Sequence, residues 1–156
     1  MLAPLWPKLI LFGFIGAIIY SDIKRREVPY FFSLGFLVLL YFQENYRGLF
    51  FGNLIVWLAL FVLIKGLEKF HYHRPAFGGA DFLFFFGTAL YFDLPQYVLF
   101  LFLSFFLGLI VSLILLACRK VNKDALIPFA PFIMAAFVLV EYWGVPLLRL
   151  YGNFYA

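Results

Sequence analysis

Two aspartates of this sequence adjoin long apolar runs, where a carboxylate is costly. Asp22 closes the first run, in IIYSDIKRREVP, and Asp81 lies between a GGA turn and a wall of Phe and Leu, in RPAFGGADFLFFF. Acids at such positions usually face the interior of a helix bundle and mark a functional site. Two converging carboxylates raise each other's pKa and can share one proton. One could then take a proton from water while its protonated partner polarises a carbonyl, as in aspartic-protease chemistry.

Each aspartate also has a simpler interpretation. Asp81 could cap the N-terminus of a helix, because Asp is favoured there and suits the helix dipole. Asp22 sits at the end of a helix, where its charge opposes the dipole, and it could pair with Lys24, Arg25 or Arg26. Gly78 and Gly79 could let a substrate strand approach the backbone beside Asp81, or could simply form a flexible loop.

The composition indicates a chain that folds in a lipid bilayer. The chain has 156 residues, of which 66% are hydrophobic and 24% aromatic, while only 13% are charged. A soluble domain of this length could not bury so much apolar surface. We therefore expect an all-α, polytopic helical bundle in a lipid bilayer, with residues 1–156 forming a single domain. The net charge of +4 needs no nucleic-acid partner, because the basic residues cluster in short loops between apolar runs.

About 20 apolar residues are needed for each helical crossing of the hydrocarbon core. Six candidate spans follow from this length, and the fourth is too short to cross without tilt or thinning. They cover approximately residues 4–21, 29–42, 48–65, 81–92, 94–117 and 127–143. Asp93-Leu94-Pro95 separates the fourth from the fifth, which predicts a short helix, a tight turn and a long helix. A single broken re-entrant element, leaving five crossings, is the alternative.

The order of the spans places both aspartates at one membrane face. Two complete crossings separate Asp22 from Asp81, and two crossings return the chain to the same side. Nine of the twelve Lys and Arg residues fall in the first, third and fifth connections, which predicts that these connections are cytoplasmic and that the N-terminus is outside. The remaining three are Lys8, Arg47 and Arg149. Glu27, Glu68 and Asp124 share the cytoplasmic side, but each lies within three residues of a basic residue, which indicates solvated loop pairs.

Other kinds of catalytic site find little support. A single cysteine, Cys118, excludes an intramolecular disulfide and a cysteine-based zinc site. His71 and His73 flank Tyr72 in a segment rich in Lys and Arg, which is more typical of a surface loop than of a metal site. HExxH, GxSxG and Walker-type motifs are absent from the sequence. We therefore expect neither a metal nor a cofactor.

Three segments resemble the type IV prepilin peptidase family, which includes the archaeal preflagellin peptidases. SDIKRREVP resembles the family's first aspartate motif, FGGAD its second, and IPFAPFIMAA the proline-flanked segment that opens a late transmembrane helix. The resemblance implies a multi-pass membrane aspartic endopeptidase without cofactor. Asp22 and Asp81 would be its catalytic pair, and Gly78, Gly79, Pro29, Pro128 and Pro131 would bind substrate or shape the site. Its substrates would be class III leader peptides of pilins, pseudopilins or archaellins, cut at the cytoplasmic face of the inner membrane.

The sequence departs from the family pattern at several positions. Tyr30 stands where the family often has Asn, and Leu83 stands where it usually has Lys, two residues after the second aspartate. Ala80 and Ala130 replace common glycines. The missing lysine puts the pKa of Asp81 and the substrate preference in question. The inserted CxxC region linked to N-methylation in larger members is absent, which predicts that the chain has no methyltransferase activity.

Two other functions are compatible with the sequence. A small proton- or ion-coupled transporter would carry its acids deeper in the spans, with access from both faces. An inactive assembly scaffold of the same fold would tolerate Asp22→Asn and Asp81→Asn. The sequence does not identify the substrate or the oligomeric state.

Overall fold

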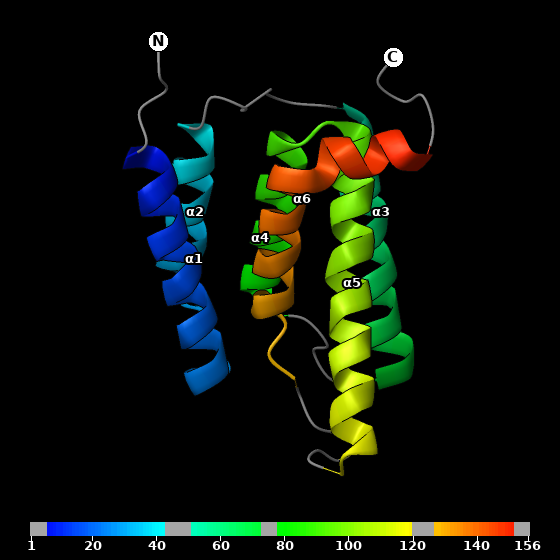
Figure 1. Cartoon of the computed structure of the whole chain (residues 1–156). Coiled ribbons are helices and arrows are strands. Elements are labelled where there is room, and N and C mark those ends of the chain that lie inside the picture. Colours follow the sequence, from blue (N-terminus) through cyan, green and yellow to red (C-terminus); the bar gives the residue numbers. More distant parts are fainter. Residues whose placement is uncertain (1–5, 43–50, 73–77, 120–126, 152–156) are drawn as a thin grey trace.

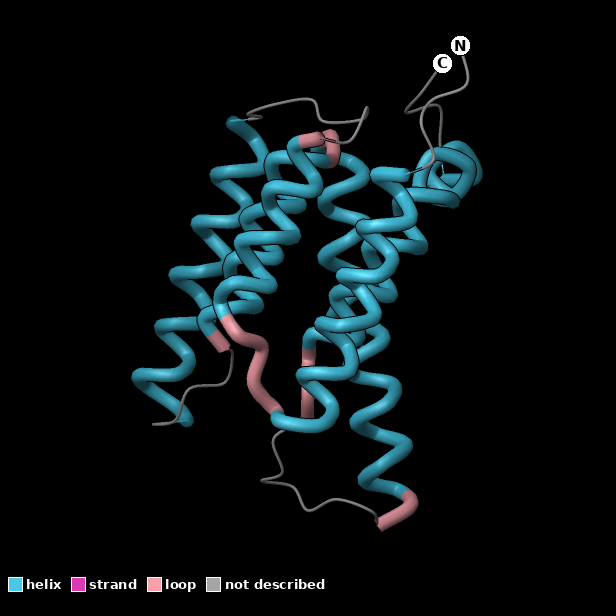
Figure 2. The backbone as a smooth tube through the Cα atoms, turned by 90° about the vertical axis from the view of Figure 1, so that its left-hand side faces the viewer, coloured by secondary structure: helices cyan, strands magenta, loops and turns pink. Residues whose placement is uncertain are grey.

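The computed structural model describes residues 6–42, 51–72, 78–119 and 127–151, and these segments form six α-helices without a β-strand (Figures 1 and 2). The helices are α1 (Trp6–Arg25), α2 (Tyr30–Tyr41), α3 (Phe51–Leu67), α4 (Gly79–Tyr91), α5 (Leu94–Ala117) and α6 (Ala130–Tyr151). A π-helical turn, η1 (Glu68–Tyr72), continues α3. The predicted all-α bundle of six helices is confirmed.

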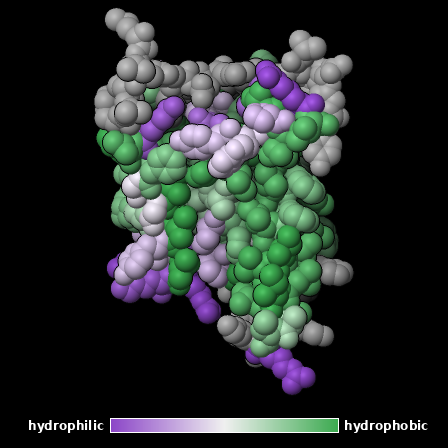
Figure 3. Space-filling view, in the orientation of Figure 1, coloured by the Kyte–Doolittle hydropathy of each residue, from purple (hydrophilic) through white to green (hydrophobic). Residues whose placement is uncertain are grey.

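The bundle is built for an apolar solvent. Within the described segments, three stretches are long and apolar enough to cross a membrane: Phe51–Phe70, Leu94–Ala117 and Ala130–Leu150. Helices α2 and α4 are apolar but shorter. Large apolar side chains are exposed at helical spacing on α3 and α5, as lipid contact requires. They include Ile55, Leu58 and Val62 on α3, and Phe102, Phe106, Leu109 and Leu113 on α5. Figure 3 shows the resulting hydrophobic surface, with hydrophilic residues gathered at its two ends.

Successive helices run in opposite directions. The C-terminal ends of α1, α3 and α5 lie at the same end of the bundle as the N-terminal ends of α2, α4 and α6, at the bottom of Figure 1. The turn between α4 and α5 lies at the other end. Asp93 caps α5 by accepting a hydrogen bond from the amide of Gln96 at 3.3 Å, and Pro95 lies in the first turn. The predicted short helix, tight turn and long helix is therefore confirmed, and the residues responsible are those that the sequence indicated.

Two details of the prediction were wrong. The last helix does not end near residue 143 but continues to Tyr151, with Pro146 inside it. Proline removes a backbone hydrogen bond and bends a helix, and Figure 1 shows the last part of α6 turning across the end of the bundle. Glu68 is not a solvated loop residue. It is buried in η1, and its carboxylate pairs with Lys65 at 2.6 Å.

Aromatic contacts join the helices that carry the site. Phe36 of α2 is fully buried and meets Phe84 of α4 and Phe137 of α6 edge to face, with ring centroids 5.5 and 5.4 Å apart. Such contacts stabilise a core beyond simple burial of area. Gly87 of α4 lies against Leu37 of α2, and a Cβ at this position would collide with that side chain. The missing side chain lets α2 and α4 approach closely.

Candidate active site

A cavity of about 560 Å³ opens at the end of the bundle where α1, α2, α4 and α6 meet. Its walls come from the last turn of α1, the segment leading into α2, the first turn of α4 and the segment leading into α6. The lining residues are Asp22, Arg25, Arg26, Glu27, Val28, Pro29, Tyr30, Gly78, Gly79, Ala80, Asp81, Ile127, Pro128 and Phe129. Both aspartates therefore line one cavity. They also lie at the same end of the bundle, as the order of the spans predicted.

Asp22 is held by a different helix from its own. Its side chain is buried in the last turn of α1, and its Oδ2 accepts a hydrogen bond of 2.9 Å from the backbone amide of Ala130. Ala130 is the first residue of α6, so Asp22 caps the N-terminus of that neighbouring helix. The positive end of the α6 dipole offsets the unfavourable position of a carboxylate at the C-terminus of α1.

The sequence around Ala130 directs its amide to this acceptor. Pro128 and Pro131 have no amide hydrogen to offer. The amides of Phe132 and Ile133 donate to the carbonyl of Phe129, at 3.0 and 3.3 Å. The proline-flanked segment thus presents the Ala130 amide to Asp22 without competition from these neighbours.

Asp81 lies in the first turn of α4, as the third helical residue. Its Oδ2 accepts a hydrogen bond of 3.1 Å from the amide of Gly78, and its own amide donates to the Gly78 carbonyl at 3.1 Å. Gly78, and not Asp81, is therefore the N-cap residue. The carboxylate contributes to capping, but it is also buried at the cavity wall, where its exposed fraction is only 9%. The simpler interpretation of Asp81 as a cap describes one part of its environment.

The two carboxyl groups lie outside the three helical stretches long enough to cross a membrane, beside the charged residues Arg25, Arg26 and Glu27. Burial raises the pKa of Asp81 to about 7, the Gly78 amide opposes this shift, and repulsion by Asp22 adds to it. Burial also raises the pKa of Asp22, against the lowering effect of the Ala130 amide. Burial is therefore the main cause of both upward shifts, and the charge of Asp22 adds the smallest of the contributions to that of Asp81.

Helix α3 fixes the position of α4 through polar contacts. The side-chain amide of Asn53 donates to the carbonyls of Ala89 and Phe92 at 2.9 and 2.7 Å, which satisfies backbone groups at the C-terminal end of α4. The indole of Trp57 donates to the Phe82 carbonyl at 3.3 Å. Lys65 lies over the ring of Phe82, the residue after Asp81, at 5.1 Å. The helix that carries Asp81 is therefore held at both of its ends.

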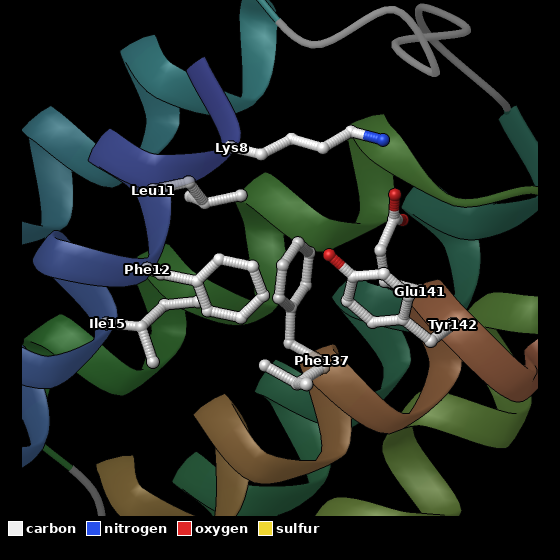
Figure 4. Close-up of a pocket in the computed structure, with 8 residues that line it drawn as sticks. Lys8, Leu11, Phe12, Ile15, Phe137, Glu141 and Tyr142 are labelled. Atoms are coloured by element: carbon white, nitrogen blue, oxygen red, sulfur yellow. The ribbon is translucent and has the colours of Figure 1, made fainter. Parts of the chain in front are cut away.

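A second, much smaller hollow lies between α1 and α6 near the opposite end of the bundle (Figure 4). It holds about 10 Å³, roughly the room of one water molecule. Phe12, Ile15 and Phe137 form its apolar wall, with Lys8 and Glu141 near its mouth. A peptide could not fit there, so the cavity of Asp22 and Asp81 is the better candidate for a substrate site.

The structure brings together most of the residues singled out in the sequence. Gly78, Gly79, Pro29 and Pro128 line the cavity with the two aspartates. Pro131 does not line it, and lies instead in the first turn of α6, where it affects the site through its missing amide. Among the described residues, no group of three or more His, Cys, Asp or Glu could hold a metal ion. His73, Asp124 and the side chain of His71 lie outside the described residues.

The sequence interpretation gave no role at the site to Ala130 or Tyr30. Ala130 takes part through a backbone amide, which leaves no signal in the residue type. Tyr30 was noted only as a departure from a family pattern, yet it stands on the cavity wall. The sequence could have indicated this role, because Tyr30 directly follows Val28-Pro29, the end of the first aspartate motif.

Two buried aspartates line one cavity at an end of an apolar helical bundle, and the long apolar helices indicate an integral membrane protein. The chain belongs to the type IV leader peptidase family, whose family model matches residues 9–113 and so includes both aspartates. Comparison with curated proteins and with solved structures gave no match. The family is that of a peptidase, in agreement with the expectation from the motifs.

Proposed function

We propose that the chain is an aspartic endopeptidase that cleaves the leader peptides of type IV prepilin-like precursors, with Asp22 and Asp81 as its catalytic pair. The observation that carries the proposal is the meeting of these two carboxyl groups, from α1 and α4, at one cavity. The cavity is large enough for several residues of a peptide and lies at the polar end of an apolar bundle. Membership of a leader peptidase family supports the substrate class.

The surroundings of the two carboxyl groups suggest a different task for each. Burial raises the pKa of Asp22, and the amide hydrogen bond at the N-terminus of α6 opposes this shift, which favours the ionised form and the role of base. Asp81 is the group with the pKa of about 7, so it can carry the shared proton and act as the acid.

Hydrolysis then proceeds in two steps. Asp22 takes a proton from water, whose oxygen attacks the carbonyl carbon of the substrate, while Asp81 gives its proton to the carbonyl oxygen. In the second step Asp22 returns its proton to the amide nitrogen and the C–N bond breaks. One hydroxyl of the tetrahedral intermediate gives its proton to Asp81, and the remaining C=O and OH form the carboxyl group of the product. Both residues return to their starting states.

The proposed location of cleavage is the cytoplasmic face of the inner membrane. It rests on the excess of Lys and Arg in the first, third and fifth connections. Arg25 and Arg26, which line the cavity, belong to the first of these. A leader peptide on this side would present its cleavage site just before its hydrophobic segment enters the bilayer.

Co-expression of the full chain with class III precursors tests the proposal. We expect processing by the wild type, and none by Asp22→Asn or Asp81→Asn at equal expression. Asp93→Asn is the matched control. It makes the same change at the opposite end of the bundle, and Asn is also a good N-cap residue. Equal processing by all variants would contradict the proposal. Retained partner binding in the same variants would indicate an assembly scaffold, and proton flux that depends on both acids would indicate a transporter.

A further inference from the structure

Tyr30 occupies a defined place on the cavity wall. It is the first residue of α2 and directly follows Pro29, which is the N-cap residue with φ of −57° and ψ of 137°. The proline ring fixes the φ angle of residue 29 and so restricts the backbone that leads into Tyr30. The side chain lines the cavity and is 65% exposed. It is therefore within reach of any ligand that occupies the cavity.

The hydroxyl of Tyr30 lies against the first turn of α4. A Cβ built on Gly79 would stand 2.5 Å from the Tyr30 hydroxyl and 3.3 and 3.4 Å from its two nearest ring carbons. Real side chains do not approach so closely, so Tyr30 keeps this position only because residue 79 is a glycine. Gly79 precedes Asp81 by two residues, which puts the phenol beside the turn that holds the catalytic carboxyl group.

The phenol is free to interact with a ligand. Within the described segments, no protein group forms a hydrogen bond with the Tyr30 hydroxyl, in contrast to that of Tyr20, which accepts a bond of 2.9 Å from Lys24. The hydroxyl of a tyrosine can act as both a donor and an acceptor. A peptide that reaches Asp81 must pass the first turn of α4, and its backbone carbonyls would then meet this donor.

We propose that Tyr30 contacts the substrate directly, donating a hydrogen bond from its hydroxyl to a carbonyl oxygen of the peptide at the scissile bond. The inference rests on the proposed function and adds a third catalytic residue to it. A donor at this position acts most strongly when the carbonyl oxygen gains negative charge on attack by water, so its contribution is greater in the transition state than in the bound substrate. Gly79 is required in this arrangement because it leaves room for the phenol.

Kinetics of the purified full-length chain, with a precursor that the wild type cleaves, test the inference. Tyr30→Phe removes only the hydroxyl, and we expect kcat to fall at least tenfold while KM changes by less than twofold. Gly79→Ala should cause a similar fall, because its methyl group displaces the hydroxyl. In the double variant the two losses should not multiply, since phenylalanine leaves only ring carbons near the new methyl group. Tyr20→Phe, an identical change on an exposed face of α1, should retain the wild-type rate.

The outcomes separate this inference from the proposed function. A wild type that cleaves and a Tyr30→Phe variant that cleaves equally fast would overturn the role of Tyr30 and leave the aspartate pair intact. Losses that multiply in the double variant would also overturn it, because Gly79 would then act independently of the phenol. A wild type without any cleavage activity would overturn the proposed function, and the role of Tyr30 with it.

Discussion

Replacing Ala130 by proline tests how Asp22 is held. The substitution replaces the amide hydrogen that Asp22 accepts, at 2.9 Å, by a carbon of the proline ring, so the carboxyl group loses this partner and must turn away from it. Proline is well tolerated at the first position of a helix, which is where Ala130 stands. Phe129 before it is already non-helical, as a residue preceding proline should be. The variant should therefore fold.

The size of the effect follows from the nature of the bond. A hydrogen bond to a charged acceptor contributes about 1.5–3 kcal/mol, and a tenfold change in rate corresponds to about 1.4 kcal/mol. If this bond holds the ionised form of Asp22 in its reactive position, kcat should fall roughly 10- to 150-fold. Burial raises the pKa of Asp22, and the Ala130 amide opposes this rise. Its removal should therefore shift the acid limb of the pH–rate profile to higher pH, because Asp22 must be ionised to act as the base.

The assay compares cleavage rates across pH for the wild type, Ala130→Pro and Ala130→Gly. The glycine variant keeps the amide and is the matched control, so it should stay close to the wild type in both rate and pH dependence. Thermal unfolding of each variant in detergent checks the fold. A folded Ala130→Pro variant with the rate and pH profile of the glycine variant would refute the role given to the α6 N-terminus.

Three further predictions concern stability. Asp81→Asn should become more stable relative to the wild type as pH rises. The folded pKa of Asp81, about 7, lies above the ordinary value of 3.8, so the free energy of unfolding of the wild type falls as pH rises through this interval. The fall is up to about 1.4 kcal/mol per pH unit. A pH-independent difference between the two proteins in thermal unfolding at pH 5 and pH 7 would contradict this. Asn53→Leu leaves two buried carbonyls of α4 without their donor and should cost about 2–4 kcal/mol in denaturant unfolding; a loss within error of zero would show that α3 does not hold α4 through this residue. Arg119→Gly relieves a left-handed residue with φ of 55° at the end of α5 and should stabilise the chain by about 1 kcal/mol without changing the cleavage rate, and a destabilised variant would contradict this.

The parts of the fold that were predictable are those encoded in apolar run length and in helix-breaking residues. The six helices follow from the first, and the turn at Asp93 and Pro95 follows from the second. The position of Asp22 and Asp81 at the same end of the bundle was also predictable, because the direction of the chain reverses with each span. This inference needs only the number of helices between the two residues, and it does not depend on how the helices pack.

The parts that were missed depend on tertiary contacts. The amide of Ala130 is chemically the same as any other backbone amide, and only the packing of α6 against α1 directs it to Asp22. Glu68 has the local sequence of a solvated acid, but the continuation of α3 into η1 buries it beside Lys65. A proline usually ends a helix, but α6 continues through Pro146 to Tyr151 with a bend. Each of these features is decided by a neighbour that is distant in sequence or by a local preference that the fold overrides.

An experimental structure of the chain with a bound peptide analogue, carrying a hydroxyl group in place of the scissile amide, would test the catalytic pair most directly. The pair proposed here predicts that the hydroxyl lies within hydrogen-bond distance, about 3 Å, of carboxyl oxygens from both Asp22 and Asp81. An analogue that inhibits cleavage while its hydroxyl contacts only one of the two aspartates, or neither, would contradict it.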